Sequence, residues 1–195
     1  MPAGEDCRVR LLDDYHKQLP EFHVVMVSDY GNGGLGYIQG MIDAARDAGI
    51  PVVVDPKGGD YSAYHRADLL PPNRKEFEQV AGRFRNDSEL EQKAKSMAVS
   101  MELGAVAITR GQEGVSLVRR SGEVSHYRGR AREVFDATGA GDTVIATPGC
   151  VFAVGGAPED SLPLANVAAG IVVGKLDAAS ATPEETLHEL AIERV

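Results

Sequence analysis

Short apolar runs rich in β-branched residues alternate along the chain with segments whose apolar residues recur at helical spacing. The strands that this pattern predicts cover residues 24–28, 51–55, 67–70 and 105–109. The helices that it predicts cover residues 38–48, 75–81, 87–101, 160–175 and 183–194. Residues 114–119 and 123–128 flank Ser121-Gly122 and predict a hairpin at one side of the sheet. The alternation predicts an α/β fold with an open, mostly parallel sheet and helices on both faces.

Specific residues predict how three of the helices begin or end. Asp87 or Ser88 is expected to cap the helix that begins there. Pro148-Gly149 is expected to interrupt a helix that starts near residue 140, because an interior proline removes a hydrogen bond and crowds the preceding turn. Pro163 should do the same one helix later, unless it lies in the first turn.

Composition narrows the class of protein. The chain of 195 residues, 43% of them hydrophobic, is long enough for one domain with a substantial core, residues 1–195. Its net charge of -9, with no basic run, argues against nucleic acid or an anionic membrane as a partner. No apolar run is long enough to span a bilayer, and the distant Cys7 and Cys150 fit reduced thiols, so we expect a cytoplasmic protein. The five histidines show no metal-site spacing.

The segment DATGAGDT, residues 136–143, places two glycines and a carboxylate where a loop turns into a helix. The peptide N–H groups of Gly139, Ala140 and Gly141 should lack intrahelical partners there and could hold a phosphate. Asp142 would lie beside that phosphate, ionised and able to accept a proton by position. By itself, such a segment is more often a tight turn and helix cap than an active site.

Other polar residues follow the predicted strands. Asp29 ends the first strand, Asp55 to Lys57 end the second, Asn73 follows the third and Arg110-Gly111 follow the fourth. Ligands of open α/β sheets bind beyond the carboxyl ends of the strands, so these residues should meet at one edge. Lys57 could contact a phosphate as a point charge, or could be a solvated lysine.

The chain resembles the ribokinase-like (PfkB) carbohydrate kinases from about Leu11 to its C-terminus. The resemblance is carried by four segments: SDYGNGGL (residues 28–35), VDPKGGDY (54–61), AREVFDATGAGDTVIAT (131–147) and LANVAAGIVVGKL (164–176). Within the family it is most similar to the branch that phosphorylates D-glycero-D-manno-heptose 7-phosphate in lipopolysaccharide core synthesis. The resemblance implies a ribokinase-like three-layer αβα sandwich, with ATP and Mg²⁺ as cofactors and a sugar phosphate as partner.

The resemblance also implies roles for particular residues. Asp142 would be the catalytic base, with Gly139, Ala140 and Gly141 stabilising the transferred phosphoryl group. Asn73 and Glu76 match the family's NxxE motif, which helps to place Mg²⁺ and phosphates, Glu76 through water. The residues expected near the nucleotide are Thr109, Arg110, Gly111, Gly114 and, beside the adenine, Asn166. Asp29 and Lys57 would lie on the sugar side.

Several features depart from the family pattern. The chain begins inside the family fold, so the N-terminal part and the lid over the sugar are expected to be missing. Asn32 stands in place of a lysine, Pro72 in place of a threonine, and Asp177-Ala178 in place of a Gly-Thr pair. These departures leave two alternatives open, a catalytically silent nucleotide-binding fragment and a kinase for another sugar. The sequence does not decide the oligomeric state, and a homodimer remains compatible with it.

Overall fold

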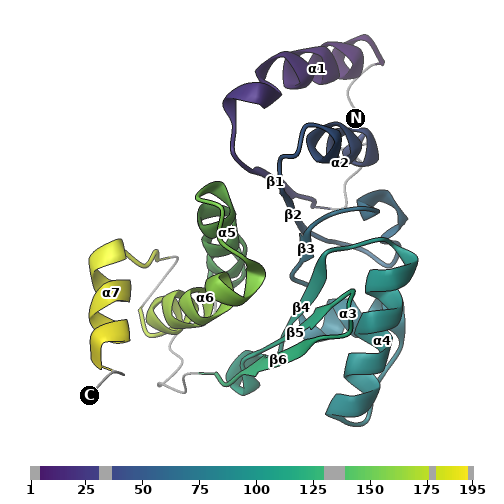
Figure 1. Cartoon of the computed structure of the whole chain (residues 1–195). Coiled ribbons are helices and arrows are strands. Elements are labelled where there is room, and N and C mark those ends of the chain that lie inside the picture. The colour runs from purple at the N-terminus through teal and green to yellow at the C-terminus, as the bar shows by residue number, and fades with distance from the viewer. Residues whose placement is uncertain (1–4, 31–36, 130–138, 176–178, 193–195) are drawn as a thin grey trace.

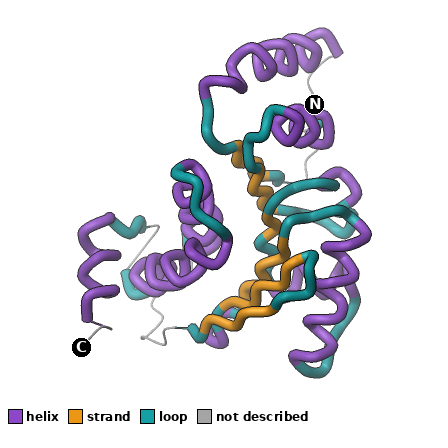
Figure 2. Tube along the Cα trace, viewed as in Figure 1, coloured by secondary structure: helices purple, strands orange, loops and turns teal. Residues whose placement is uncertain are grey.

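A six-stranded sheet runs through the computed structural model, which describes residues 5–30, 37–129, 139–175 and 179–192 (Figure 1). The strand order is β1-β2-β3-β4-β5-β6. The parallel strands are β1 (Val25–Ser28), β2 (Val52–Asp55), β3 (Leu69–Leu70) and β4 (Ala105–Thr109). An antiparallel hairpin of β5 (Val115–Arg119) and β6 (Val124–Tyr127) continues the sheet beyond β4. Figure 2 shows these strands as one twisted surface with helices on either side.

Helices cover both faces of the sheet. One face carries α2 (Ile38–Asp47), α3 (Arg74–Ala81) and α4 (Asp87–Ser100). The other face carries α5 (Ala140–Ala153) and α6 (Pro158–Val173), which pack against each other. Two helices lie outside these layers: α1 (Glu5–Gln18) beside α2, and α7 (Pro183–Ile192) beside α6 (Figure 1). Short 3-10 turns occur at Leu19–Glu21, Ser62–Tyr64 and Gly111–Glu113.

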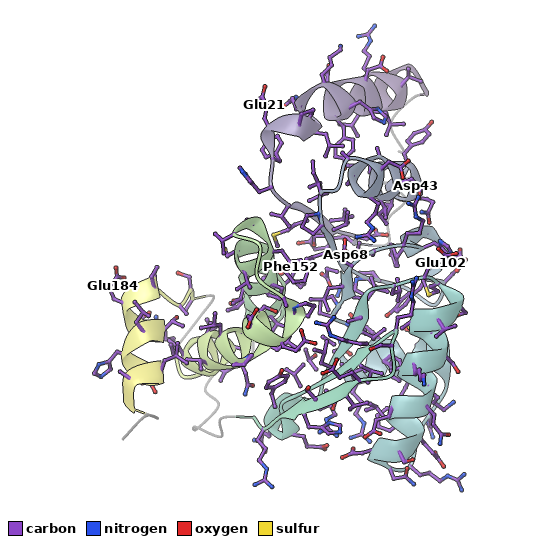
Figure 3. The ribbon with its side chains drawn as sticks, viewed as in Figure 1. Glu21, Asp43, Asp68, Glu102, Phe152 and Glu184 are labelled. Carbon is purple, nitrogen blue, oxygen red and sulfur yellow. The ribbon has the colours of Figure 1, made fainter. Side chains whose placement is uncertain are left out.

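Successive side chains of the central strands point to opposite faces of the sheet, and this divides the hydrophobic core into two halves. Val52 and Val54 of β2 face the α2–α4 side, whereas Val53 faces the α5–α6 side. Phe152 of α5 belongs to the second half and lies between its helix and the sheet (Figure 3). Strands that are buried on both faces become continuous apolar runs, which is the pattern of a covered parallel sheet.

The structure confirms the predicted α/β class, the mostly parallel sheet, the terminal hairpin and helices on both faces. Element boundaries differ by one to two residues in most cases, as fraying helix ends allow. The expected cap of α4 was wrong: Asn86 precedes the helix, and its side chain accepts from the Glu89 N–H at 2.9 Å. Helix α1 was not predicted, although Leu12, Tyr15 and Leu19 recur at helical spacing at and just beyond it.

The expectation that prolines break the last helices was wrong. Helix α5 runs through Pro148 to Ala153, and α6 runs through Pro163 to Val173. Tertiary contacts hold both. A Cβ at Gly149 would lie 2.3 Å from the Met26 sulfur, so glycine lets α5 pack closely on β1.

Helix α6 begins at Pro158, so Pro163 is an interior residue. Proline lacks the N–H that would bond to the carbonyl of Glu159. The Tyr127 hydroxyl donates to that carbonyl at 3.4 Å. The side chain from β6 therefore supplies a partner that the proline cannot.

Among the described residues, no helix combines the length and the apolar character needed to cross a membrane.

Candidate active site

A pocket of about 280 Å³ opens beyond the carboxyl ends of the parallel strands. Residues from six separate parts of the chain line it, as expected for a ligand site at this edge of an α/β sheet. The residues proposed from the sequence that line the pocket are Lys57, Asn73, Glu76, Thr109, Gly111, Gly114, Gly141, Asp142 and Asn166. Asp55, which was expected at this edge of the sheet without a specific role, and Tyr30 add further polar groups to the lining.

The N-terminus of α5 forms one wall of the pocket. Gly139 precedes the helix with φ 82°, a left-handed conformation that glycine adopts without strain. The first intrahelical hydrogen bond runs from the Thr143 N–H to the Gly139 carbonyl at 3.0 Å. The N–H groups of Ala140, Gly141 and Asp142 therefore precede the hydrogen-bonded ladder, and Gly139 at the N-cap position has no side chain to cap the helix. This is the geometry of an anion-binding helix terminus.

Asn73 and Glu76 form a reciprocal capping box at the start of α3. The Asn73 side chain accepts from the Glu76 N–H at 3.0 Å, and Glu76 Oε2 accepts from the Asn73 N–H at 2.8 Å. The two residues that match the NxxE motif therefore cap α3. These hydrogen bonds also fix the position of the Glu76 carboxylate. The preceding Pro72 keeps the carbonyl that accepts from the Thr109 N–H at 3.0 Å.

Lys57 joins Glu76 to a buried carboxylate at the end of β2. Its Nζ lies 2.7 Å from Glu76 Oε1 and 3.3 Å from Asp55 Oδ1. Burial raises the pKa of Asp55; Lys57 opposes this, while Glu76 and Asp142 add to it. Burial alone would lower the pKa of Lys57, but the hydrogen bond to Glu76 and the charge of Asp55 raise it. Asp55 and Glu76 thus flank the Lys57 ammonium, and the charge of Asp142 also acts on Asp55.

The turn between β4 and β5 forms a second wall. The Arg110 N–H donates to the Gly114 carbonyl at 2.7 Å, and the Gly114 N–H donates to the Gly111 carbonyl at 3.0 Å. Thr109, Gly111 and Gly114 contribute to the pocket. The Arg110 side chain does not: it is 8% exposed and turns toward α4, where it contacts Asp87 at 2.6 Å. In this structure it anchors the turn.

Asn166 of α6 lies at the far end of the pocket, where its Nδ2 donates to the Arg128 carbonyl at 2.5 Å. The wall beside it is apolar. Its members are Pro71, Val115, Val144, Ile145 and Ala169. An apolar lining that includes one amide side chain suits a planar ring such as a nucleobase.

On the opposite side, Tyr64 connects the two residues assigned to the sugar. Its hydroxyl donates to Asp29 Oδ2 at 2.7 Å and accepts from the Lys57 N–H at 3.3 Å. Burial and the hydrogen bond to Asp29 raise the pKa of Tyr64 to about 12. Tyr64 was not predicted from the sequence, because a tyrosine five residues after a glycine pair carries no functional signal of its own.

Tyr64 has a matched neighbour in Tyr61. Both residues are 2% exposed and their ring centroids lie 5.6 Å apart, but among the described residues the Tyr61 hydroxyl has no hydrogen-bond partner. We therefore expect Tyr64→Phe to lower the free energy of unfolding by about 1–2 kcal/mol, because it removes the buried hydrogen bond that the Tyr64 hydroxyl donates to Asp29. Tyr61→Phe should change it by less than about 0.5 kcal/mol. Urea unfolding measures both, and equal losses would contradict the assignment.

Several predicted positions lie outside the described residues. They are Asn32, Asp177, Ala178 and residues 136–138 of the DATGAGDT segment.

The carboxylates fit Mg²⁺ only as an ion held through water and phosphate. No group of three His, Cys, Asp or Glu side chains that could hold a metal occurs in the described part of the chain. Both Glu76 oxygens already accept hydrogen bonds, from Asn73 and from Lys57. Since Mg²⁺ keeps several waters and binds through few carboxylates, Asp55, Glu76 and Asp142 are suitable outer ligands for an ion that arrives with phosphate.

The layered sheet, with its pocket at the carboxyl ends of the strands, defines a ribokinase-like α/β fold. Phosphofructokinase-2 from Escherichia coli in complex with potassium matches it with a TM-score of 0.81 at 20% identity, over 100% of this chain and 65% of that chain. Arabidopsis thaliana ribokinase, complexed with ribose and ATP, matches with a TM-score of 0.80 at 24% identity, over 91% of this chain and 59% of that chain. At these identities the likeness concerns the fold alone.

A model of the pfkB family of carbohydrate kinases matches residues 34–185. The chain therefore belongs to the PfkB carbohydrate kinase family. The bifunctional protein HldE of Halorhodospira halophila is 50% identical over 167 residues, which are 86% of this chain and 35% of that protein. HldE of Methylococcus capsulatus is 46% identical over 175 residues, 90% of this chain and 37% of that protein. The chain thus spans little more than a third of the length of these curated relatives.

Proposed function

We propose that the protein transfers the γ-phosphoryl group of ATP to the anomeric hydroxyl of D-glycero-D-manno-heptose 7-phosphate. The product would be heptose 1,7-bisphosphate, an intermediate of ADP-heptose and lipopolysaccharide inner-core synthesis in the cytoplasm. The observation that carries the proposal is the convergence of Asp142, the free N-terminus of α5 and the Asn73-Glu76 pair on one pocket. Family membership supports a sugar acceptor, and the segments at residues 28–35 and 54–61 favour a heptose phosphate over other sugars.

In this proposal, Asp142 holds the acceptor hydroxyl and takes its proton as the new bond forms. Phosphoryl transfer passes through a loose transition state, so placement and charge stabilisation matter more than the strength of the base. The N–H groups at the start of α5 would face the negative charge on the transferred group. Lys57, released from one of its carboxylates, could contribute a positive charge nearby.

The adenine would lie against the apolar wall near Asn166, and the phosphates would extend from the β4–β5 turn toward Gly141. Mg²⁺ bound to the phosphates would neutralise part of their charge. Asn73 and Glu76 would orient its waters from a position that their capping box already fixes.

The proposal is tested by measuring thermal unfolding with ATP and Mg²⁺, together with ADP release in the presence and absence of heptose 7-phosphate. Mg-ATP at about one hundred times its dissociation constant should add roughly 2.7 kcal/mol, a rise in Tm of about 5–10 °C. ADP release should depend on the sugar phosphate. GTP with Mg²⁺ serves as the nucleotide control, and ribose or fructose as the sugar controls.

A second function, nucleotide binding without transfer, is favoured by one observation. On the sugar side, Asp29 is held by Tyr64 and Lys57 by Glu76, so few described polar groups there are directed at an acceptor. A clear shift with Mg-ATP and no sugar-dependent ADP release would support this second function. No shift with Mg-ATP at millimolar concentration would contradict both.

A further inference from the structure

The ammonium of Lys57 occupies the position of a cation between two carboxylates. Its Nζ donates to Glu76 Oε1 at 2.7 Å and to Asp55 Oδ1 at 3.3 Å. Carboxylate oxygens of this kind are the ligands that Mg²⁺ uses in proteins. A hydrated divalent ion that bridged these two groups would compete with the ammonium for the same space.

Neither carboxylate is free to turn away from this position. Asp55 is 6% exposed and ends β2, within the sheet. Glu76 Oε2 accepts from the Asn73 N–H at 2.8 Å, which leaves Oε1 directed at Lys57. The pair is therefore preorganised around a cation, whichever cation that is.

The charge of the pocket makes this cation important. Among the described residues that line the pocket, the carboxylates are Asp55, Glu76 and Asp142, and Lys57 is the single lysine or arginine. Without its ammonium, the buried Asp55 would face two negative groups with nothing to compensate them, which is costly in a partly buried site. A divalent cation is the substitute that offers the same contacts.

We infer that Lys57 is the resident cation of this pocket and that it keeps Mg²⁺ off the Asp55–Glu76 pair in the absence of nucleotide. Metal binding then depends on the nucleotide, because phosphate oxygens bring the ion and attract the ammonium away from Glu76. The inference deepens the proposed function and rests on it for the identity of that nucleotide. The exclusion of Mg²⁺ in the absence of nucleotide depends only on the side chains of Lys57, Asp55 and Glu76.

The experiment compares thermal unfolding of the parent, Lys57→Met, Lys57→Arg and Lys75→Met in MgCl₂ without nucleotide, against NaCl of equal ionic strength. Lys75 is an exposed lysine on α3 outside the pocket, so Lys75→Met matches the charge change of Lys57→Met. Lys57→Met should gain a Tm rise of about 2–5 °C at Mg²⁺ roughly ten times its dissociation constant. The parent, Lys57→Arg and Lys75→Met should gain none.

If Lys57→Met does not fold, Lys57→Gln gives the same test, because its amide still donates to Glu76. The inference is overturned if the variant without the ammonium gains no stabilisation, or if the parent gains as much from MgCl₂ alone. A parallel arm with Mg-ATP reports on the proposed function separately. If Mg-ATP does not raise the Tm of the parent, the proposed nucleotide site is contradicted. The measurements in MgCl₂ without nucleotide would still decide the role of Lys57.

Discussion

Asp142→Asn should lower sugar-dependent turnover by a factor of about 10²–10⁴ while Mg-ATP still stabilises the protein. The amide keeps the shape of the carboxylate at the start of α5 but cannot accept the proton of the acceptor hydroxyl. Because the N–H groups of the helix terminus remain, the phosphates should still bind. Turnover is measured by coupled ADP release with heptose 7-phosphate, and nucleotide binding by thermal shift.

Asp14→Asn is a suitable control for this substitution. Asp14 is an exposed carboxylate on α1 whose contact is the Lys17 ammonium at 3.6 Å, remote from the pocket. Its replacement removes the same charge and should leave turnover unchanged. If Asp142→Asn also keeps turnover within a few-fold of the parent, Asp142 is a structural residue at a helix start and the proposed chemistry is wrong.

Gly114→Ala should lower the free energy of unfolding by about 2–5 kcal/mol and abolish stabilisation by Mg-ATP. Gly114 has φ 91°, and an added Cβ would lie 1.9 Å from the Tyr127 carbonyl oxygen and 2.3 Å from the Gly129 nitrogen. Both neighbours are backbone atoms, so the β4–β5 turn or the end of β6 would have to move. That movement would displace one wall of the nucleotide pocket.

Gly111 provides the matched comparison in the same turn. It also has a positive φ, 59°, but a Cβ there would meet nothing within 4 Å. Gly111→Ala should therefore cost only the conformational strain, about 1 kcal/mol. Urea unfolding of the two variants separates strain from collision. Equal stabilities would contradict the close approach of Gly114 to β6.

The sequence by itself determined the order of elements and the edge of the sheet where the polar residues meet. Apolar runs such as residues 52–54 are dictated by burial on both faces, so they identify strands without knowledge of their neighbours. The helix start at residues 139–142 also depends on local signals. Glycine and a first-turn carboxylate act on the backbone within one turn of the helix. These signals depend on a few adjacent residues.

Only the tertiary structure decided the partners of those residues. Pro148 and Pro163 lie within helices that pack on each other and on the sheet, and the Tyr127 hydroxyl binds the carbonyl that Pro163 leaves without its helical partner. Arg110 turns toward Asp87 and out of the pocket, although its position in the sequence predicts a nucleotide contact. Lys57 meets Glu76, 19 residues away along the chain, because parallel strands bring their carboxyl ends together. Such contacts join residues that no local pattern relates, and they are set by how the layers pack.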